Sequence, residues 1–379
     1  MTVALVTYST KPRGGVVHTL ALAEALHDLG EDVRVVALGD PASGFFRPVR
    51  VPVTIVPGPT GELDLEQKVA ASIDLLADAL SVIDAPVQHA QDCISARAAA
   101  RIRDAGAAVT VLRTVHHVDD FTSPVLIDCQ RQAILEPDVV LAVSRVWQQI
   151  LLADYGVKAG VVPNGVDVSR FANAPIERAR SLRASVGASS RPLLLAVGGI
   201  EPRKGSDTLV RALAALGPVR PVLAVIGGHS FQDHRPYREA VLAQLPGLGL
   251  ELGDDVIAVG TVADDDMPAW YAAADVLAFP SVKEGFGLAV LEAMSAGVPV
   301  VTSDLPVFRE YLVDGRDALL VSVGDVRGLA DALLLALHDS KRLVTAGRQV
   351  AARFTWEASA RRHLQLYADL NTAATALPS

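Results

Sequence analysis

Two glutamates, Glu284 and Glu292, stand eight residues apart in the stretch KEGFGLAVLEAMSAGVPVV. Gly285 and Gly287 lie between them and permit positive φ angles and close approach of the backbone to another group. The residues that follow favour a helix of about ten residues, which Gly297 and the nearby proline would end. The stretch is therefore predicted to be a loop that leads into a helix, with one carboxylate in the loop and the other along the helix.

The start of this helix is expected to bind an anion. Its first N–H groups have no helical partner and the helix dipole adds partial positive charge, so the backbone from Gly287 to Ala289 suits a phosphate. A carboxylate would repel that phosphate, and each glutamate is therefore predicted to contact a neutral, hydroxyl-rich group beside it. A nucleoside diphosphate sugar has this layout of ribose, diphosphate and sugar. The alternative is that Glu284 and Glu292 are ordinary solvated side chains, because the bare spacing is common.

The composition restricts the class of protein. With 379 residues, of which 50% are hydrophobic and 20% charged, the chain suits two domains that contain buried parallel strands. The net charge of −9 argues against a nucleic-acid-binding protein, which normally carries a basic face. Any phosphate ligand must then be held by local groups rather than by the overall charge.

Cysteine content and hydropathy exclude several other classes. Cys93 and Cys129 are too few for a disulfide framework, and no cluster of cysteine and histidine indicates a metal site. The first residues, MTVALVTYSTKPRGG, enter a strand directly and show no signal-peptide pattern. No window has the roughly 18 apolar residues of a membrane span. The sequence therefore predicts a cytoplasmic protein.

Short apolar runs alternate with helical patterns, which indicates βαβ units and parallel sheets. The first half contains VALVTYS, VRVVAL, VTIVP, PVQHAQ, VTVLRTVHH and VVLAVS. After Val162 the rhythm breaks in a segment rich in turn residues, which we interpret as the connection between domains. The sequence predicts an N-terminal domain at 1–165 and a C-terminal domain at 166–356 that includes this connection. The helical pattern at 357–375 is expected to pack back on the first domain.

The second half repeats the rhythm with RPLLLAVGG, PVLAVIGG, VIAVG, DVLAFPS, PVVTSD and ALLVSV. Both domains are thus predicted to be doubly wound α/β domains, which bind ligands at the carboxyl ends of their strands. Two such domains that face each other would form a cleft from both sets of strand ends. Glu284 follows DVLAFPS and so falls at a strand end.

The motifs of the chain, taken in order, resemble those of a known enzyme family. EGFGLAVLE is the most specific, and it is accompanied by VVPNGVD, AVGGIEPRKG, AVIGG, MPAWYAAADVLAFPS and SAGVPVVTSDLPVFREYL. The set is similar to glycosyltransferase family 4, or glycosyl transferases group 1. Members of this family are retaining enzymes with the GT-B fold, in which two Rossmann-like domains face each other across a cleft. The resemblance covers most of the chain and is densest from Arg191 to Asp317.

The resemblance implies roles for both glutamates. Glu284 would contact the hydroxyl groups of the donor sugar, and Glu292 would contact those of the ribose. Backbone N–H groups of the loop and helix start would face the sugar and the phosphates. The residues that this places in the donor site are Gly285, Phe286, Gly287 and Leu288.

Arg203 and Lys204 follow the first strand of the second half, in GGIEPRKG. Opposite unit charges 4 Å apart interact by about 4 kcal/mol at an effective dielectric constant near 20, so this pair could stabilise a diphosphate leaving group. Such stabilisation would remove the need for a metal ion, and we expect neither a metal nor another cofactor. The alternative is a solvated, charged turn before the next helix.

The nucleobase is expected near the strand VIAVGTV and the glycines of VIGGHS. Backbone groups around Gly260 and Thr261 could read one edge of the base. The neighbouring acidic run, Asp264 to Asp266, resembles a metal-binding motif of another glycosyltransferase fold. We predict instead that these aspartates cap the helix that follows and complement its dipole.

Gly14 and Gly15 lie between a strand and a helix, where the family has a glycine loop near the donor phosphates and the acceptor. A tight turn is the alternative. His116, at a strand end in RTVHHVDD, matches the family histidine that faces the donor sugar. His117 departs from the acidic residue or glycine common at the next position, so the sequence does not decide which histidine faces the donor. A structural, hydrogen-bonded histidine is the alternative reading.

Two further stretches have competing explanations. HAQDCIS offers His89, Asp92 and Ser95 to an acceptor pocket, but a helix cap explains the last two residues more simply, and we predict the cap. The basic stretch KRLVTAGRQVAARF could contact an acidic membrane surface if the acceptor is a lipid. A solvated helix face explains the same pattern.

The sequence therefore predicts a metal-independent, retaining glycosyltransferase, of the hexosyltransferase class, that uses a nucleoside diphosphate sugar. Its acceptor would be a hydroxyl group of a sugar, lipid or small molecule. The alternatives are an epimerase or hydrolase of the same sugar nucleotide and a non-catalytic sugar-nucleotide-binding protein. A nicotinamide dehydrogenase is disfavoured, because G-x-G-x-x-G is missing after the first strand. The sequence does not specify the base, the sugar, the acceptor or the oligomeric state.

Overall fold

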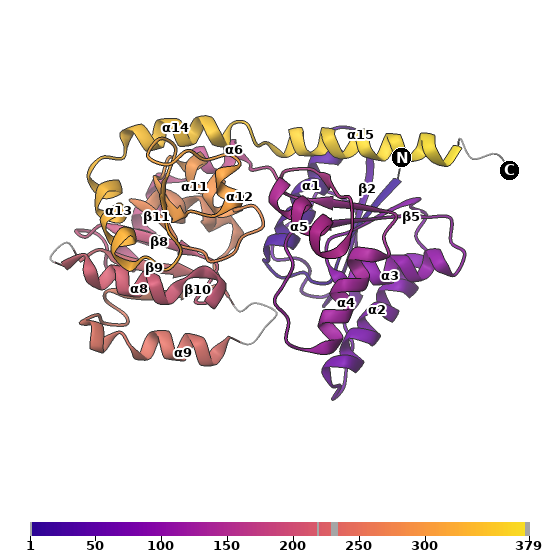
Figure 1. Ribbon diagram of the computed structural model, residues 1–379, viewed down its shortest axis with the longest axis horizontal. Helices are drawn as coiled ribbons and strands as arrows, with labels where there is room; N and C mark the ends of the chain where they lie inside the picture. Colours follow the sequence, from indigo (N-terminus) through magenta and orange to yellow (C-terminus); the bar gives the residue numbers. More distant parts are fainter. Residues whose placement is uncertain (1, 218–219, 229–233, 376–379) are drawn as a thin grey trace. The chain divides into compact units, whose positions relative to one another are not determined.

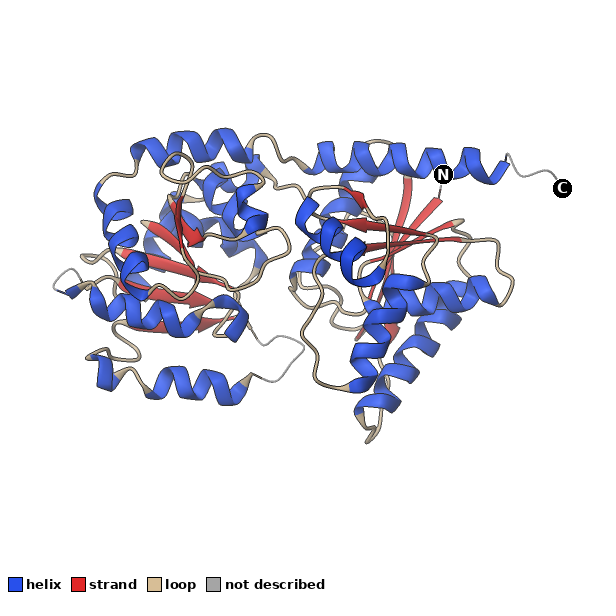
Figure 2. Cartoon of the chain, viewed as in Figure 1, coloured by secondary structure: helices blue, strands red, loops and turns tan. Residues whose placement is uncertain are grey.

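The computed structural model describes residues 2–217, 220–228 and 234–375 (Figure 1). The chain divides into two compact units, Met1–Gly165 with Trp356–Ser379, and Val166–Thr355. Each unit contains a parallel sheet with helices on both faces (Figure 2). Within the described residues, no helix combines the length and the hydropathy that crossing a bilayer requires.

The first unit has a seven-stranded parallel sheet with the order β3-β2-β1-β4-β5-β6-β7. All six apolar runs of the first half form strands, which confirms that part of the sequence prediction. The short strand β7 was not predicted. The elements of this unit are β1 (Thr2–Thr7), α1 (Gly14–Asp28), β2 (Asp32–Gly39), β3 (Val53–Pro57), α2 (Leu65–Ser81), β4 (Val87–Ala90), α3 (Cys93–Asp104), β5 (Thr110–Val115), α4 (Pro124–Leu135), β6 (Val139–Ala142), α5 (Arg145–Tyr155), β7 (Gly160–Val161) and α15 (Trp356–Thr375).

The second unit has a six-stranded parallel sheet with the order β10-β9-β8-β11-β12-β13. The six apolar runs of the second half again form strands, and the predicted connection contains two helices that pack on this unit. Its elements are α6 (Val168–Ala172), α7 (Ile176–Ser185), β8 (Leu193–Val197), η1 (Pro202–Lys204), α8 (Ser206–Ala215), β9 (Val222–Ile226), α9 (Arg235–Ala243), η3 (Pro246–Leu248), β10 (Val256–Gly260), η4 (Asp264–Asp266), α10 (Met267–Ala273), β11 (Val276–Phe279), α11 (Leu288–Ala296), β12 (Val300–Ser303), α12 (Pro306–Arg309), β13 (Leu319–Val321), α13 (Val326–His338) and α14 (Lys341–Ala351).

The strands are nearly continuous apolar runs because helices cover both faces of each sheet. Successive side chains of a strand point to opposite faces. In β1, Val3 and Leu5 accordingly pack in one core cluster with α1, whereas Ala4 and Val6 pack in another with α2 and α3. Tyr367 belongs to the cluster of Val3, and α15 therefore packs against the first unit.

Strand order positions the residues of interest. The order reverses between β1 and β4 in the first sheet and between β8 and β11 in the second, and doubly wound sheets bind ligands at such switch points. The turn η1 follows β8 and carries Arg203 and Lys204, while the loop after β11 carries Glu284. In the first unit, the connection after β1 leads to Gly14 and Gly15.

Candidate functional site

The loop after β11 is held in place by aromatic packing. Gly287 has a φ of +91°, and a Cβ there would lie 2.5 Å from Cε1 of Phe308, so the position requires glycine. The ring of Phe286 stacks on that of Tyr311 with centroids 5.4 Å apart, and the Tyr311 hydroxyl donates to the Phe286 carbonyl oxygen at 2.7 Å. Gly285 is buried in the same loop. These contacts fix the start of α11, which confirms the predicted helix.

Glu284 forms ion pairs with both cations of the η1 turn. Its Oε1 lies 2.7 Å from Nζ of Lys204 and 3.0 Å from Nη1 of Arg203. The side chains of Glu284, Lys204 and Arg203 are 8%, 13% and 32% exposed. Burial raises the pKa of Glu284, but the charges of Lys204 and Arg203 outweigh it and lower this pKa to about 2. Burial also lowers the pKa of Lys204, and the charge of Glu284 opposes that effect.

These ion pairs correct one part of the sequence prediction. The charge pattern of the sequence predicts a neutral, hydroxyl-rich partner for Glu284 and a diphosphate for the two cations, and it does not predict an ion pair among the three side chains. The structure joins all three side chains, because a buried lysine without a carboxylate partner would carry a large desolvation cost. An ammonium group has three donors and a guanidinium has five, so the pairing does not exhaust the donors of Lys204 and Arg203.

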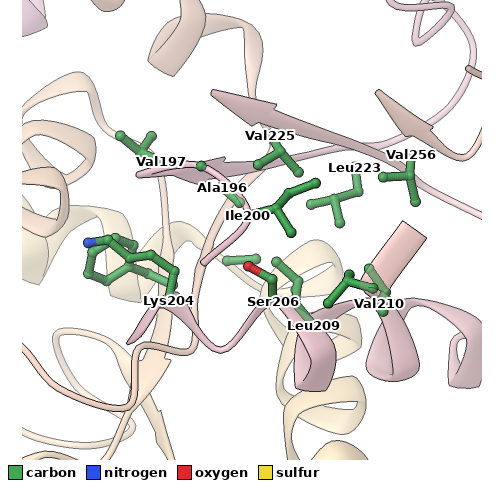
Figure 3. Close-up of a pocket in the computed structure, with 14 residues that line it drawn as sticks. Ala196, Val197, Ile200, Lys204, Ser206, Leu209, Val210, Leu223, Val225 and Val256 are labelled. Atoms are coloured by element: carbon green, nitrogen blue, oxygen red, sulfur yellow. The ribbon is translucent and has the colours of Figure 1, made fainter. Parts of the chain in front are cut away.

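Close contacts hold Lys204 in its position. A Cβ on Gly205 would lie 2.0 Å from the Pro280 carbonyl oxygen, and one on Gly198 would lie 2.3 Å from Cε of Lys204. The Lys204 ammonium lies 4.5 Å from the ring centroid of Phe279. Figure 3 shows Lys204 at the rim of a small, mainly apolar cavity of ≈ 20 Å³, with its ammonium group turned away from the aliphatic lining. The cavity is thus part of the packing beneath η1, and the donor groups of Lys204 lie outside it.

Glu292 lies on α11 and has a neutral partner. The Tyr271 hydroxyl donates to Oε2 of Glu292 at 2.6 Å. Burial raises the pKa of Glu292, while this hydrogen bond and the charge of Arg170 oppose the rise. Arg170 itself donates to the carbonyl oxygen and Oδ2 of Asp264 at 2.6 and 2.7 Å. In the described part of the chain Glu292 therefore forms no ion pair, in contrast to Glu284.

Gly260 and Thr261 lie at the end of β10, beside the glycines that follow β9. Gly260 has a φ of +80°, and its carbonyl oxygen accepts a hydrogen bond from the N–H of Gly227 at 2.9 Å. A Cβ on Gly228 would lie 2.4 Å from Oγ1 of Thr261. The loops after β9 and β10 thus approach each other too closely for larger residues. The last two residues of VIGGHS lie outside the described part of the chain.

The acidic run of η4 does not cap a helix. Asp264 pairs with Arg170 and Asp266 pairs with Arg178, each at 2.7 Å. Among the described residues, no side chain caps η4 or α10. The predicted cap is therefore wrong, because arginines of α6 and α7 offer these carboxylates stronger, charge-assisted partners.

In the first unit, Gly14 and Gly15 are the first residues of α1. A Cβ on Gly15 would lie 3.6 Å from Cδ2 of His116, so the structure brings these two predicted residues together. Nε2 of His116 lies 3.1 Å from Oε1 of Gln91, and the ring meets that of His18 edge-on with centroids 4.7 Å apart. Burial, followed by the charge of His18, lowers the pKa of His116 well below its usual value, so the imidazole is neutral at pH 7.

The other histidines of the first unit have different surroundings. Nε2 of His117 lies 3.1 Å from Oδ1 of Asp119, so His116 rather than His117 adjoins the glycines. The predicted cap at HAQDCIS is confirmed, since Oδ1 of Asp92 accepts a hydrogen bond from the N–H of Ser95 at 2.8 Å. His89 is fully buried, and its two ring nitrogens lie 2.7 Å from the hydroxyl oxygens of Tyr367 and Thr114.

Three residues with clear structural roles at this site were missed in the sequence. Tyr271 belongs to the motif MPAWYAAAD, but its contact with Glu292 depends on the packing of α10 against α11. Tyr311 and Gly198 hold Phe286 and Lys204, and nothing in the sequence indicates these contacts.

Known proteins match most of the chain. A family model described as Glycosyltransferase Family 4 matches residues 12–170, and one described as Glycosyl transferases group 1 matches residues 191–339. A GDP-mannose-dependent alpha-(1-6)-phosphatidylinositol monomannoside mannosyltransferase from Mycobacterium tuberculosis is 32% identical over 338 residues, which cover 82% of this chain and 80% of that protein. The protein of the same name from Mycolicibacterium smegmatis is 33% identical over 257 residues, and the match spans just under two thirds, 65%, of each chain.

A solved structure has a similar fold. Anabaena Alr3699/HepE in complex with UDP-glucose aligns with a TM-score of 0.81 at 22% identity, covering 97% of this chain and 100% of that one. Similarity at this level of identity concerns the fold, and it agrees with the two parallel-sheet units. The chain therefore belongs to glycosyltransferase family 4, the glycosyl transferases group 1, and has the GT-B fold of two Rossmann-like domains.

Proposed function

We propose that the protein is a metal-independent, retaining hexosyltransferase that transfers a sugar from a nucleoside diphosphate sugar to an acceptor hydroxyl. The observation that carries the proposal is the group formed by Glu284, Lys204 and Arg203 just before the start of α11. It combines an ionised carboxylate, which accepts hydrogen bonds from sugar hydroxyls, with two cations that donate to a diphosphate.

Departure of the nucleoside diphosphate develops negative charge on a phosphate oxygen. A positioned donor that meets such charge in a site shielded from water is worth about 2.7–4 kcal/mol of barrier lowering. Lys204 is only 13% exposed, so solvent screens its charge weakly. The N–H groups at the start of α11 add partial positive charge. Together these groups supply the charge that a divalent metal would otherwise provide.

Transfer with retention would proceed without a covalent intermediate on the protein. The departing diphosphate oxygen takes the proton of the acceptor hydroxyl, and the acceptor oxygen bonds to the anomeric carbon on the same face. We assign His116 a contact with the donor sugar. Its imidazole is neutral at pH 7, so it would act as a hydrogen-bonding group and not as a charge.

We assign the donor mainly to the second unit and the acceptor to the first. Glu292 would bind the ribose and Gly260 with Thr261 would lie near the base, while Gly14 and Gly15 would allow close approach of a ligand to the start of α1. The donor loop would contribute Gly285, Phe286, Gly287 and Leu288.

GDP-mannose is the first donor to test, and a phosphatidylinositol mannoside is the first acceptor. Both follow from the name of the mycobacterial relatives. UDP-glucose is the second donor, because it is bound in the similar Anabaena structure.

A thermal-shift screen with EDTA present tests donor binding. A ligand at 100 times its dissociation constant stabilises the native protein by about 2.7 kcal/mol, so the correct sugar nucleotide should raise the melting temperature clearly. Glu292→Ala should weaken its binding by about 1–3 kcal/mol. The absence of any shift across GDP-, UDP- and ADP-sugars would contradict the proposal.

Turnover is then measured as release of nucleoside diphosphate, with and without acceptor. Release that depends on acceptor supports a transferase, whereas equal release without it identifies a hydrolase. Proton NMR of the product reports whether the anomeric configuration of the donor is retained. An inverted product would refute the retaining mechanism.

A further inference from the structure

Glu284 and Glu292 occupy different electrostatic environments. Glu284 has cationic nitrogens at 2.7 and 3.0 Å, whereas Glu292 has the hydroxyl of Tyr271 at 2.6 Å. Cations that neutralise a carboxylate reduce its attraction for other donors, while a neutral hydroxyl leaves its charge in place. Glu292 is therefore the carboxylate with more capacity to accept hydrogen bonds from a ligand.

Tyr271 occupies one oxygen of Glu292 and leaves the other accessible. The hydrogen bond ends on Oε2, and within the described residues Oε1 accepts none. Glu292 is half-buried rather than fully buried, so its side chain is not sealed from solvent. An ionised carboxylate offers about four lone-pair sites, and two adjacent hydroxyl groups of a ribose can use those that remain.

The position of Tyr271 is itself fixed by packing. Its side chain is fully buried on α10, and its ring meets that of Phe171 edge-on, with centroids 5.5 Å apart and planes at 80°. Burial, with the charge of Glu292, raises the pKa of Tyr271 well above its usual value, so the hydroxyl remains a donor at neutral pH. A glutamate has three rotatable side-chain bonds, and a bond to a rigid tyrosine selects one arrangement of them.

Arg170 is the cation that could compete for Glu292. Its charge already acts on the pKa of Glu292, but its Nη2 donates to the carbonyl oxygen and Oδ2 of Asp264. Asp264 is the first residue of η4, which directly precedes α10, and Tyr271 lies on α10. The continuous segment of η4 and α10 therefore both binds Arg170, the competing cation, and supplies the neutral hydroxyl of Tyr271.

We propose that Tyr271 is a positioning residue that fixes Glu292 for the ribose of the donor, and that it thereby sets the preference for ribose over deoxyribose. The inference rests on the proposed function, in which Glu292 contacts the ribose. Tyr271 acts through Glu292 and does not touch the donor. Its loss should therefore affect ligands that carry ribose hydroxyls and spare ligands that lack them.

Calorimetric titration of the full chain with GDP, UDP and ADP first identifies the nucleotide that binds most tightly. That nucleotide and its 2′,3′-dideoxy form are then titrated into wild type, Tyr271→Phe, Glu292→Ala and Tyr367→Phe. Tyr367 is the matched control, because it is also a fully buried tyrosine, and its hydroxyl lies 2.7 Å from Nδ1 of His89 in the first unit. Thermal melting checks that each variant is folded.

The wild type should bind the ribose form about tenfold or more tightly than the dideoxy form, as expected for hydrogen bonds to a charged group. Tyr271→Phe should reduce this ratio at least about fivefold by weakening the ribose form, whereas Tyr367→Phe should keep it. Equal weakening of both forms by Tyr271→Phe would indicate a purely structural role and overturn the inference.

Two other outcomes separate the inference from the proposed function. If Glu292→Ala abolishes the ribose preference and Tyr271→Phe retains it in full, the inference is wrong and the assignment of Glu292 stands. If the wild type binds both forms equally, or binds none of the three nucleotides, the assignment of Glu292 fails and the inference fails with it.

Discussion

Gly198→Ala tests whether the position of the Lys204 ammonium controls turnover. Gly198 has a φ of +119°, and a Cβ there would lie 2.3 Å from Cε and 3.0 Å from Cδ of Lys204. Nonbonded carbon atoms prefer separations of about 3.5–4.0 Å, so the lysine side chain must move by roughly 1 Å or more. Such a shift disrupts the 2.7 Å contact between Nζ of Lys204 and Oε1 of Glu284.

Two separate costs follow from this one methyl group. Alanine at a strongly positive φ destabilises the fold by about 1–3 kcal/mol. Displacement of a donor that stabilises developing charge lowers kcat by about 10²–10³. If Lys204 assists departure of the diphosphate, Gly198→Ala should therefore lose about 100-fold or more in kcat and be only moderately less stable than wild type.

Gly253→Ala provides the matched control. Gly253 has a φ of +97° in the same unit, and no described atom lies within 4 Å of its would-be Cβ. Both variants should lose similar melting temperature, but only Gly198→Ala should lose turnover in a nucleoside diphosphate release assay. The double variant with Gly198→Ala and Lys204→Ala should have nearly the same kcat as Lys204→Ala alone, because both changes act through the same ammonium group. If Gly198→Ala keeps the kcat of Gly253→Ala within about twofold, Lys204 does not act from this position and the reasoning is refuted.

Two further predictions concern the first unit. Burial lowers the pKa of His18 to about 3 and that of His363 to about 4. Each histidine therefore contributes stability at pH values above its unfolded-state pKa of 6.5, and this contribution is lost as the pH falls toward the folded-state pKa. At pH 5 the contribution of each histidine to the free energy of unfolding should be about 2 kcal/mol smaller than at pH 7.5. Hydrogen exchange should then show that α1 and α15 open more readily at pH 5 than at pH 7.5. Equal protection at both pH values would contradict this. Gly14→Ala should leave the melting temperature unchanged or raise it, because no described atom lies within 4 Å of the added Cβ and alanine is the better helix former. Weaker nucleotide or acceptor binding by this stable variant would support close approach of a ligand at Gly14, and unchanged binding of both would argue against it.

The strands and α11 could be predicted because their signals are local. A parallel strand covered on both faces is a short apolar run, and α11 consists of good helix formers between Gly287 and Gly297. The cap formed by Asp92 and Ser95 is local as well, since the two residues lie within one helical turn. Where a structural feature depends on neighbours in sequence, the sequence was sufficient to predict it.

Ion-pair partners could not be predicted in the same way. Glu284 pairs with Lys204, 80 residues away, and Asp264 pairs with Arg170, 94 residues away. The sequence offered an explanation for each carboxylate that did not involve a distant cation. In the structure, each carboxylate pairs with a cation that the tertiary fold places beside it. Such choices depend on which loops follow neighbouring strands, and this order is not visible in local patterns.

The glycines show a similar division. From the sequence, Gly14 and Gly287 receive the same interpretation, as residues that permit unusual backbone angles or close approach of another group. In the structure a Cβ on Gly14 meets no described atom within 4 Å, whereas one on Gly287 would lie 2.5 Å from Phe308. The requirement for glycine therefore depends on distant side chains, and mutational cost should differ strongly between the two positions.

The ion pair between Glu284 and Lys204 leads to a prediction for the pH dependence of turnover. Burial lowers the pKa of Lys204 and Glu284 opposes this, so removal of the negative charge should lower the pKa of Lys204 further. Glu284→Gln keeps the size of the side chain and its ability to accept a hydrogen bond from a sugar hydroxyl, but it removes that charge. If a protonated Lys204 stabilises the leaving group, as proposed, the alkaline limb of the kcat profile should shift to lower pH in this variant. An unshifted limb with reduced kcat would mean that Glu284 acts on the sugar alone, and that Lys204 keeps its proton without help from Glu284.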